Sequence, residues 1–291
     1  MHEPVLLKEV LEIFKPRPGQ KYIDATIDGG GHTMAIFEKI QPEGKLLGID
    51  WDCDLINSLK NKNNLLLTCD NYANIKSISG QHNLGKVNGI LFDLGFSSYH
   101  IEKSGRGFSF LKDEPLDMRY NPHNNALTAK KIINEWPREA IENIIREYGE
   151  EKFAKRIALN IVKERNSGRI STTGQLVKII SKSLPPFQLK QRIHFATRTF
   201  QALRIAVNNE LENFKNALND SIDILTVNGI IIVISFHSLE DRIAKNIFKE
   251  KSKIGAIKII TKKPVGPAVE ELAYNPRARS AKLRAAQKLT N

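Results

Sequence analysis

Residues 21–32 read KYIDATIDGGGH, and this stretch decides the fold class. Residues 21–27 have the apolar and β-branched character of a strand, and residues 33–40 continue as a short helix. Between them, the consecutive glycines Gly29–Gly31 let the backbone approach a ligand closely. Dinucleotide-binding folds hold a pyrophosphate at this position. A strand, a glycine-rich turn and a helix in this order predict the first βα unit of an open α/β sheet.

The same alternation continues toward the C-terminus. Expected strands lie at residues 45–49, 65–68, 89–92 and 229–234, with an edge strand at 257–261. Strands separated by helical stretches of this length predict a Rossmann-like α/β fold with a mostly parallel sheet. Residues 109–211 show no strand pattern. Within them, residues 140–165 repeat apolar positions every four residues and are expected to be helical.

We therefore expect two domains. Residues 1–107 and 212–291 form a discontinuous catalytic domain, and residues 108–211 form an all-helical insertion suited to substrate recognition. The end of the chain, residues 275–291, is rich in Arg and Lys. Together with basic groups of the insertion, it is expected to hold phosphate groups.

The composition points to a polyanionic partner. The chain has 291 residues, with 44 Lys and Arg against 32 Asp and Glu, and a net charge of +12. Cys53 and Cys69 are the only cysteines, too few for a disulfide framework or a metal-ligand cluster. The longest apolar run, residues 230–234, is far short of the ~20 residues of a membrane helix, and no signal peptide is visible. We expect a reduced, cytoplasmic protein without a metal, and leave open a monomer or a homodimer.

Carboxylates border the glycine turn. Asp24 and Asp28 lie in the turn, and Asp50 ends the second strand. An acid at the end of that strand can bond both hydroxyls of a ribose. Negative charge in the turn opposes a pyrophosphate but suits the cationic sulfonium of S-adenosylmethionine. The pattern favours S-adenosylmethionine and leaves a nicotinamide or flavin nucleotide as the alternative.

The fourth strand ends at Asp93, and Ser97 and Ser98 follow closely. Ligands of doubly wound sheets bind at the carboxyl ends of the strands, so these residues are expected beside Gly30 and Asp50 as catalytic candidates. Candidates for binding the substrate are Phe96, Arg106, Phe108, Asp117, Arg119, His194, Arg198, His237 and Arg242.

Several of these residues also have a structural explanation. Ser238 with Asp241 could form a capping box that opens a helix. Asp117 and Arg119 could form a surface ion pair, which stabilises little. The remaining residues with such an alternative are His194, as a structural histidine, and Phe96 and Phe108, as core residues.

The chain closely resembles the bacterial ribosomal RNA small-subunit methyltransferase H family. Nine segments match in order along nearly the whole chain, and several are long and unusual, notably ATRTFQALRI at 196–205 and SFHSLEDR at 235–242. The matching segments are His2–Leu7, Asp24–His32, Phe92–Ser98, Arg106–Phe110, Pro115–Arg119, Tyr148–Glu151, Ala196–Val207, Ser235–Arg242 and Asn275–Arg284.

The resemblance implies a Rossmann-like methyltransferase domain interrupted by a helical domain that helps to hold the substrate. It implies methylation of the exocyclic N4 of a cytidine in the decoding (P-site) region of 16S rRNA, with S-adenosylmethionine as cofactor and the small ribosomal subunit as partner. The residues it places at the cofactor are Gly30, Gly31, His32, Asp50, Tyr72, Asp93 and His100.

Three positions depart from the family pattern. Asp28 stands where the family has glycine, His100 where it has a cofactor-binding glutamine, and Phe195 where it has proline. We expect retained activity, because the other motifs are intact. Asp28 could change the geometry of the loop, and His100 puts one cofactor contact in doubt.

The expected chemistry is an in-line transfer of a methyl group from a sulfonium to an amine nitrogen, with Asp93 accepting a hydrogen bond from the amine. The base has to be unstacked first, and Phe96 or Phe108 could stack on it. Three other functions compete: a nucleotide-dependent oxidoreductase, a non-catalytic small-subunit assembly factor, and a methyltransferase acting on DNA or protein.

Overall fold

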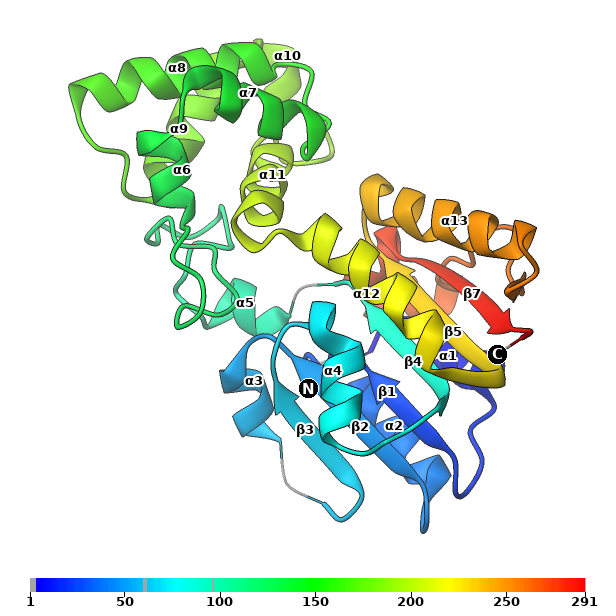
Figure 1. The fold of residues 1–291 in the computed structure, drawn as a ribbon. Helices are drawn as coiled ribbons and strands as arrows, with labels where there is room; N and C mark the ends of the chain where they lie inside the picture. Colours follow the sequence, from blue (N-terminus) through cyan, green and yellow to red (C-terminus); the bar gives the residue numbers. More distant parts are fainter. Residues whose placement is uncertain (1–3, 60–61, 96, 291) are drawn as a thin grey trace. The chain divides into compact units, whose positions relative to one another are not determined.

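The computed structural model describes residues 4–59, 62–95 and 97–290 (Figure 1). The chain divides into two compact units. The first unit comprises Met1–Phe96 and Leu211–Asn291, and the second comprises Ser97–Glu210. The second unit is thus an insertion in the first. No helix among the described residues is long and apolar enough to cross a membrane.

The first unit is built on a mostly parallel sheet. Its described residues form seven strands in the order β3-β2-β1-β4-β5-β7-β6. The five parallel strands are β1 (Lys21–Asp24), β2 (Lys45–Asp50), β3 (Leu65–Cys69), β4 (Val87–Asp93) and β5 (Leu225–Ser235). Two strands are antiparallel to their neighbours: β7 (Lys282–Lys288) and, at the edge, β6 (Ile257–Ile259). The predicted Rossmann-like α/β class is confirmed.

Helices cover both faces of this sheet (Figure 1). On one face, Val10 and Phe14 of α1 (Leu7–Phe14) and Ile36 of α2 (Gly31–Ile40) pack onto the strands. The opposite face is covered by α4 (Ile75–Gln81), α12 (Glu210–Ile224) and α13 (Ser238–Lys253). The shorter helices of the unit are α3 (Cys53–Ser58), α14 (Val269–Tyr274) and the two 3₁₀ turns η1 (Tyr72–Asn74) and η2 (Pro276–Ser280). Burial on both faces explains the continuous apolar run of β5.

The C-terminal segment corrects one prediction. Residues 282–288, expected as part of a basic tail that holds phosphates, are strand β7 between β5 and β6. Arg284 donates two hydrogen bonds to Asp241 of α13, at 2.6 and 3.1 Å. Lys288 donates to the carbonyl oxygens of Asp223 and Leu225. These two cations hold the sheet together, so phosphate binding through them was a wrong expectation.

The second unit is helical, with its own apolar core. Its helices are α5 (Ser98–Glu102), α6 (Ala129–Glu135), α7 (Arg138–Glu147), α8 (Ala154–Ser167), α9 (Thr173–Ser183), α10 (Pro186–Leu189) and α11 (Thr197–Asn208). The helix expected over 140–165 is broken between α7 and α8. A Cβ on Gly149 would lie 2.6 Å from the Arg198 carbonyl oxygen, and Glu150 has a left-handed φ of 48°. The chain turns at Gly149 and Glu150 because α11 passes close to Gly149. The spacing of apolar residues in the sequence cannot predict such a turn.

Candidate active site

Three carboxylates end neighbouring parallel strands. Asp24 ends β1, Asp50 ends β2 and Asp93 ends β4. Because β1 pairs with both β2 and β4, the three strand ends lie along one edge of the sheet. Asp24 is fully buried and Asp93 almost so. This edge carries the concentration of negative charge that the sequence predicted around the glycine turn.

The turn itself requires its glycine. Gly30 has a φ of +77°, in the left-handed region, and a Cβ there would lie 2.8 Å from Leu59. Asp28 also has a left-handed φ, of 49°. Aspartate tolerates this region better than most residues. Asp28 therefore adopts a backbone conformation that glycine also adopts readily.

Asp50 links the glycine turn to the segment after β2 through hydrogen bonds. Its Oδ2 accepts a hydrogen bond from the Asp28 N–H at 3.0 Å, and its Oδ1 accepts one from the Asp52 N–H at 2.9 Å. The residue as a whole is half-buried, but its carboxyl group is desolvated enough to raise its pKa to about 7. Each carboxylate oxygen has a second lone pair, so Asp50 can still accept hydrogen bonds from a ligand's hydroxyl groups.

Asp24 is held from inside the protein. The Thr33 hydroxyl donates to its Oδ2 at 2.6 Å, and the Thr26 N–H donates to its Oδ1 at 3.2 Å. Burial raises the pKa of Asp24 to about 6, and the hydrogen bond from Thr33 opposes that shift. Thr33 was not predicted as part of the site. Its signal is the position on the first turn of α2, facing the end of β1.

Asp93 has two neighbours from the glycine turn region. Its N–H donates to the Thr26 hydroxyl at 2.7 Å, and its Oδ2 lies 3.4 Å from Nδ1 of His32. The other ring nitrogen of His32, Nε2, lies 2.9 Å from the Val5 carbonyl oxygen and must donate to it. The predicted residues His32 and Asp93 are thus brought together, and both are nearly buried.

Tyr72 follows β3 at the same edge, in η1. Its ring is half-buried and meets Phe92 edge-on, with centroids 5.8 Å apart. Gly31 begins α2, and a Cβ there would lie 2.9 Å from Pro4. The structure therefore brings together six of the seven predicted cofactor residues in the first unit: Gly30, Gly31, His32, Asp50, Tyr72 and Asp93.

The seventh residue, His100, belongs to the second unit. It is buried in an aromatic cluster, with ring centroids 4.9 Å from Phe108 and 5.0 Å from Tyr120. Phe108 stacks on Tyr120 and is itself only 6% exposed. The ring of Phe108 therefore packs in the helical core, which favours the core alternative over a stacking platform for a base. Ser97 caps α5 by accepting the Tyr99 N–H at 3.0 Å.

Arg106, Asp117 and Arg119 organise a loop of the second unit. Arg119 makes a two-pronged ion pair with Asp117, at 2.6 and 2.7 Å, which raises the pKa of Arg119. The pair is only about one-fifth exposed, and Arg119 also donates to the carbonyl oxygens of Pro122 and Asn125. Arg106 donates to the carbonyl oxygens of Arg119 and Tyr120. These contacts give the three residues a structural role. The ion pair of Asp117 and Arg119 forms, as the structural alternative expected, but it is partly buried rather than on the surface.

His194 and Arg198 line a pocket of the second unit. His194 lies between Phe110 and Phe195, with centroids 4.4 and 4.3 Å away, and burial lowers its pKa. Arg198 is exposed and donates to the Glu150 carbonyl oxygen. Four polar neighbours that were not among the predicted site residues also line the pocket: Glu151, Lys152, Gln188 and Gln191.

The helix after β5 starts differently from the prediction. The N-cap of α13 is His237, not Ser238: the His237 ring accepts the Glu240 N–H, and the Glu240 carboxylate accepts the His237 N–H. His237 therefore opens the helix, and Arg242 lies exposed on its first turns. Of the other substrate and catalytic candidates, Phe96 lies outside the described residues, and Ser98 is the first residue of α5.

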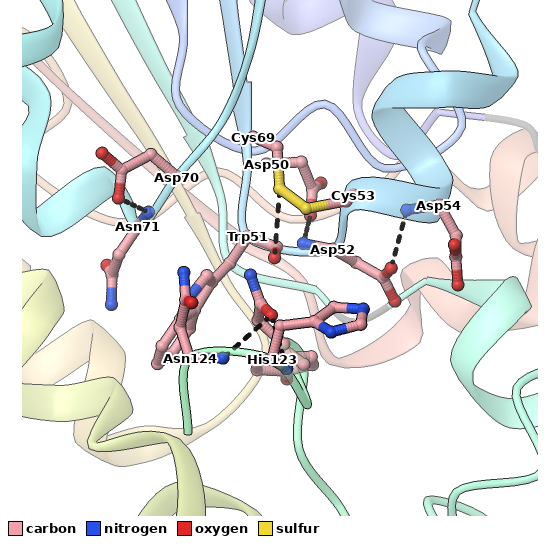
Figure 2. The surroundings of a disulfide bond; sticks show 12 residues. Asp50, Trp51, Asp52, Cys53, Asp54, Cys69, Asp70, Asn71, His123 and Asn124 are labelled. Atoms are coloured by element: carbon pink, nitrogen blue, oxygen red, sulfur yellow. Dashed lines mark hydrogen bonds between the residues drawn. A yellow bond between two sulfur atoms is a disulfide. The ribbon is translucent and has the colours of Figure 1, made fainter. Parts of the chain in front are cut away.

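The cysteines differ from the expectation of a reduced chain. Cys53 and Cys69 are joined in a disulfide (Figure 2). Two cysteines were too few to suggest a framework, but their positions carried a signal. Cys53 follows the end of β2 and Cys69 is the last residue of β3, and these strands are parallel neighbours.

Known proteins match the chain over its full length. The model of the MraW methylase family matches residues 1–289. The chain belongs to this family. The ribosomal RNA small subunit methyltransferase H of Persephonella marina is 45% identical, covering 99% of each chain. Its counterpart in Heliobacterium modesticaldum is 44% identical, over 99% of this chain and 98% of the relative. Among solved structures, an rRNA methylase from Streptococcus thermophilus covers 100% of this chain and 99% of its own, with a TM-score of 0.43 and 10% identity.

Membership of the MraW methylase family makes the chain a methyltransferase with S-adenosylmethionine as its cofactor. A nicotinamide or flavin cofactor, and with it the oxidoreductase alternative, no longer applies. The residues present fit this cofactor. Buried carboxylates with raised pKa suit a ligand that brings a sulfonium and an ammonium group, because its positive charge favours their ionised forms.

Proposed function

We propose that this methyltransferase transfers the methyl group to the exocyclic N4 of a cytidine in the P-site region of 16S rRNA, within the small ribosomal subunit in the cytoplasm. The observation that carries the proposal is the 45% identity, over nearly the full length of both chains, to a relative named for small-subunit ribosomal RNA. The net charge of +12 suits an RNA substrate.

Within this proposal, Asp50 binds the ribose hydroxyls of the cofactor, Tyr72 lies beside its adenine, and the backbone of Gly30, Gly31 and His32 follows its methionine portion. His100 stands at the family's glutamine position but is buried among aromatic rings. We therefore assign the cofactor contacts to the six residues of the first unit.

Asp93 is the group proposed to act on the substrate. The lone pair of a cytosine amine is delocalised into the ring, so the amine is a poor nucleophile. A carboxylate that accepts a hydrogen bond from the amine favours pyramidal nitrogen as positive charge develops. Holding the nitrogen in line with the methyl group supplies several kcal/mol more. Ser97 and Ser98 assist, and the proton leaves to water after transfer.

The helical unit is proposed to hold the RNA. A target base has to leave its stack before it can react. Phosphate and base contacts are assigned to the pocket that His194, Phe195 and Arg198 line, with Lys152 as a second cation. Exposed Arg242 on α13 is a further phosphate contact.

The test uses small ribosomal subunits from cells that lack the enzyme. Purified protein and S-adenosylmethionine carrying a heavy-isotope methyl group are added, and the digested RNA is analysed by mass spectrometry. The proposal predicts labelled N4-methylcytidine at a single P-site position. Label on another nucleoside, on DNA or on a ribosomal protein would contradict it. No label, together with tight binding to the subunit, would favour the assembly-factor function.

A further inference from the structure

The disulfide lies at the cofactor edge of the sheet. Cys53 is the first residue of α3, and Cys69 is the last residue of β3, 16 residues later. Figure 2 shows the linked sulfurs directly beside the end of β2, where Asp50 and Trp51 lie. The Cα atoms of the two cysteines are 5.1 Å apart. The bond therefore joins the segment that follows β2 to the segment that follows β3.

Both joined segments contact Asp50. Cys69 is the register partner of Asp50 in the β2–β3 pair, and the Asp70 N–H donates to the Asp50 carbonyl oxygen at 3.0 Å. On the other side, the Asp52 N–H donates to the Asp50 carboxylate, directly before Cys53. The disulfide thus links the two segments that contact Asp50, the residue proposed to bind the ribose.

The same bond connects the two sides of the proposed adenosine site. Asp50, assigned to the ribose, precedes Cys53 by three residues, and Tyr72, assigned to the adenine, follows Cys69 by three. The inference below rests on these assignments of the proposed function. Cleavage of the disulfide would therefore allow Asp50 and Tyr72 to move more freely relative to each other.

The helix that follows β2 is short. The helix α3 has six residues, and Leu55 is its one buried residue among those described. Its N-terminus is capped by Asp52, which accepts the Asp54 N–H at 3.0 Å. A helix this short is not stable by itself. The disulfide therefore adds a covalent link to β3 in a segment whose helix is too short to fix its own position.

The bond joins two residues that are each partly exposed. Both cysteines are half-buried rather than enclosed, and thiol–disulfide exchange requires access to a sulfur. In compartments where small thiols keep proteins reduced, protein disulfides are usually transient and serve catalysis or redox sensing. Neither sulfur is needed for methyl transfer, which leaves sensing.

We propose that Cys53 and Cys69 form a reversible redox switch of cofactor binding, in which the disulfide form binds the adenosine part of the cofactor more tightly than the dithiol form. In reduction, two molecules of a small thiol become one small disulfide, while the protein disulfide takes up two electrons and two protons. Oxidation is the reverse reaction, with a small-molecule disulfide as the oxidant.

Thermodynamic linkage makes the switch reciprocal. If oxidation lowers the dissociation constant of the ligand by a given factor, saturating ligand shifts the thiol–disulfide equilibrium toward the disulfide by the same factor. Couplings between sites are typically about 5- to 150-fold, and we expect the lower end because the cysteines lie beside the ligand contacts without touching the reacting methyl group.

The experiment measures S-adenosylhomocysteine binding to the full-length protein by calorimetry, after complete oxidation with oxidised glutathione and after complete reduction with dithiothreitol. The switch predicts a dissociation constant at least about fivefold lower for the oxidised protein. In a second measurement, the oxidised fraction in mixed glutathione buffers is determined with and without saturating S-adenosylhomocysteine, and should shift by the same factor.

The double variant Cys53→Ser/Cys69→Ser is the control, because it cannot form the bond and has no thiol left that could form a mixed disulfide with glutathione. It should bind like the reduced protein under both conditions. Equal binding by the oxidised and reduced forms of the natural protein, or tighter binding by the reduced form, would overturn the switch and leave the proposed function intact. Absence of binding in both forms would overturn the assignment of the cofactor site, and the switch with it. The comparison on the natural protein stands even if the variant folds poorly.

Discussion

His32 links the start of the chain to the proposed reacting centre. Its Nε2 donates to the Val5 carbonyl oxygen, and its Nδ1 lies 3.4 Å from the Asp93 carboxylate. This contact holds the Asp93 carboxylate in one orientation. The imidazole is engaged within the protein, which makes His32 a positioning residue for Asp93.

His32→Ala should therefore lower kcat by ~10- to 100-fold, since small misplacements of reacting groups have effects of this size. The dissociation constant of S-adenosylhomocysteine should change by less than about threefold, because the neighbouring backbone contacts remain. Single-turnover methylation and calorimetry check the two numbers. Loss of cofactor binding in step with activity would instead identify the ring as a cofactor ligand.

Asp50 and Asp24 make the site sensitive to pH. Desolvation raises the pKa of Asp50 to about 7 and that of Asp24 to about 6, against 3.8 for an ordinary aspartate. Between about pH 4 and 7 the folded chain thus binds protons that the unfolded chain does not. The resulting stability is present at low pH and is lost as the pH rises through 6 and 7.

Two opposite trends should follow between pH 6 and 8. The protein without cofactor should unfold at a higher temperature at pH 6 than at pH 8. Affinity for S-adenosylhomocysteine should be weaker at pH 6, because a protonated Asp50 is a poorer acceptor for the ribose hydroxyls. Thermal unfolding and calorimetry across this range measure both, and Asp50→Asn should flatten the two profiles. If the unfolding temperature and the affinity both rose, or both fell, between pH 6 and pH 8, the assignment of Asp50 to the ribose hydroxyls would be contradicted.

Among the elements, β1, β2, β4 and the glycine turn were predictable, and β7 was not. The first three are short apolar runs that end at polar residues, the pattern of buried parallel strands. The segment 282–288 reads KLRAAQK, without β-branched residues, and its two buried cations suggest a tail until their partners are known. Tertiary contacts with Asp241 and with backbone carbonyl groups decide its structure.

Tertiary side-chain contacts also limited how much of the site could be predicted from the sequence. The carboxylates at the strand ends were visible in the sequence, because topology alone brings such residues together. Thr33 and the pairing of His32 with Asp93 were not, since they depend on side-chain geometry. The disulfide was missed because counting cysteines ignores the strands that carry them.

The position of Arg284 in β7 allows a test of whether this strand is structural or an RNA-binding tail. Arg284→Met leaves Asp241 with its charge in a setting that is only 15% exposed, and should destabilise the protein by about 3 kcal/mol. The matched control is Lys258→Met on the neighbouring strand β6, whose side chain is exposed and should matter little. Urea unfolding measures both. If Arg284→Met weakened RNA binding and left stability unchanged, the tail interpretation would return.

At the scale of the whole molecule, the proposed function assigns the cofactor to the first unit and the RNA pocket to the second. Lys152→Gln and Arg198→Gln change pocket residues of the helical unit alone. Each should raise KM for the small subunit by about 3- to 10-fold, and reduce the salt dependence of binding by about one released ion. Binding of S-adenosylhomocysteine should be unchanged.

Lys131→Gln, on exposed α6 surface of the same unit, is the matched control and should leave KM unchanged. Methylation assays at several salt concentrations provide the measurement. An equal effect of all three substitutions would show that overall charge matters and the pocket does not.

The most direct test of the account compares the natural protein with Asp93→Asn on small subunits from cells lacking the enzyme. Asparagine keeps the size of the side chain but removes the charge that accepts the amine hydrogen. Single-turnover formation of N4-methylcytidine should fall by at least ~100-fold, while S-adenosylhomocysteine still binds and the protein remains folded. A folded Asp93→Asn protein that methylates the same cytidine at the natural rate would contradict the proposed role of this strand-end carboxylate.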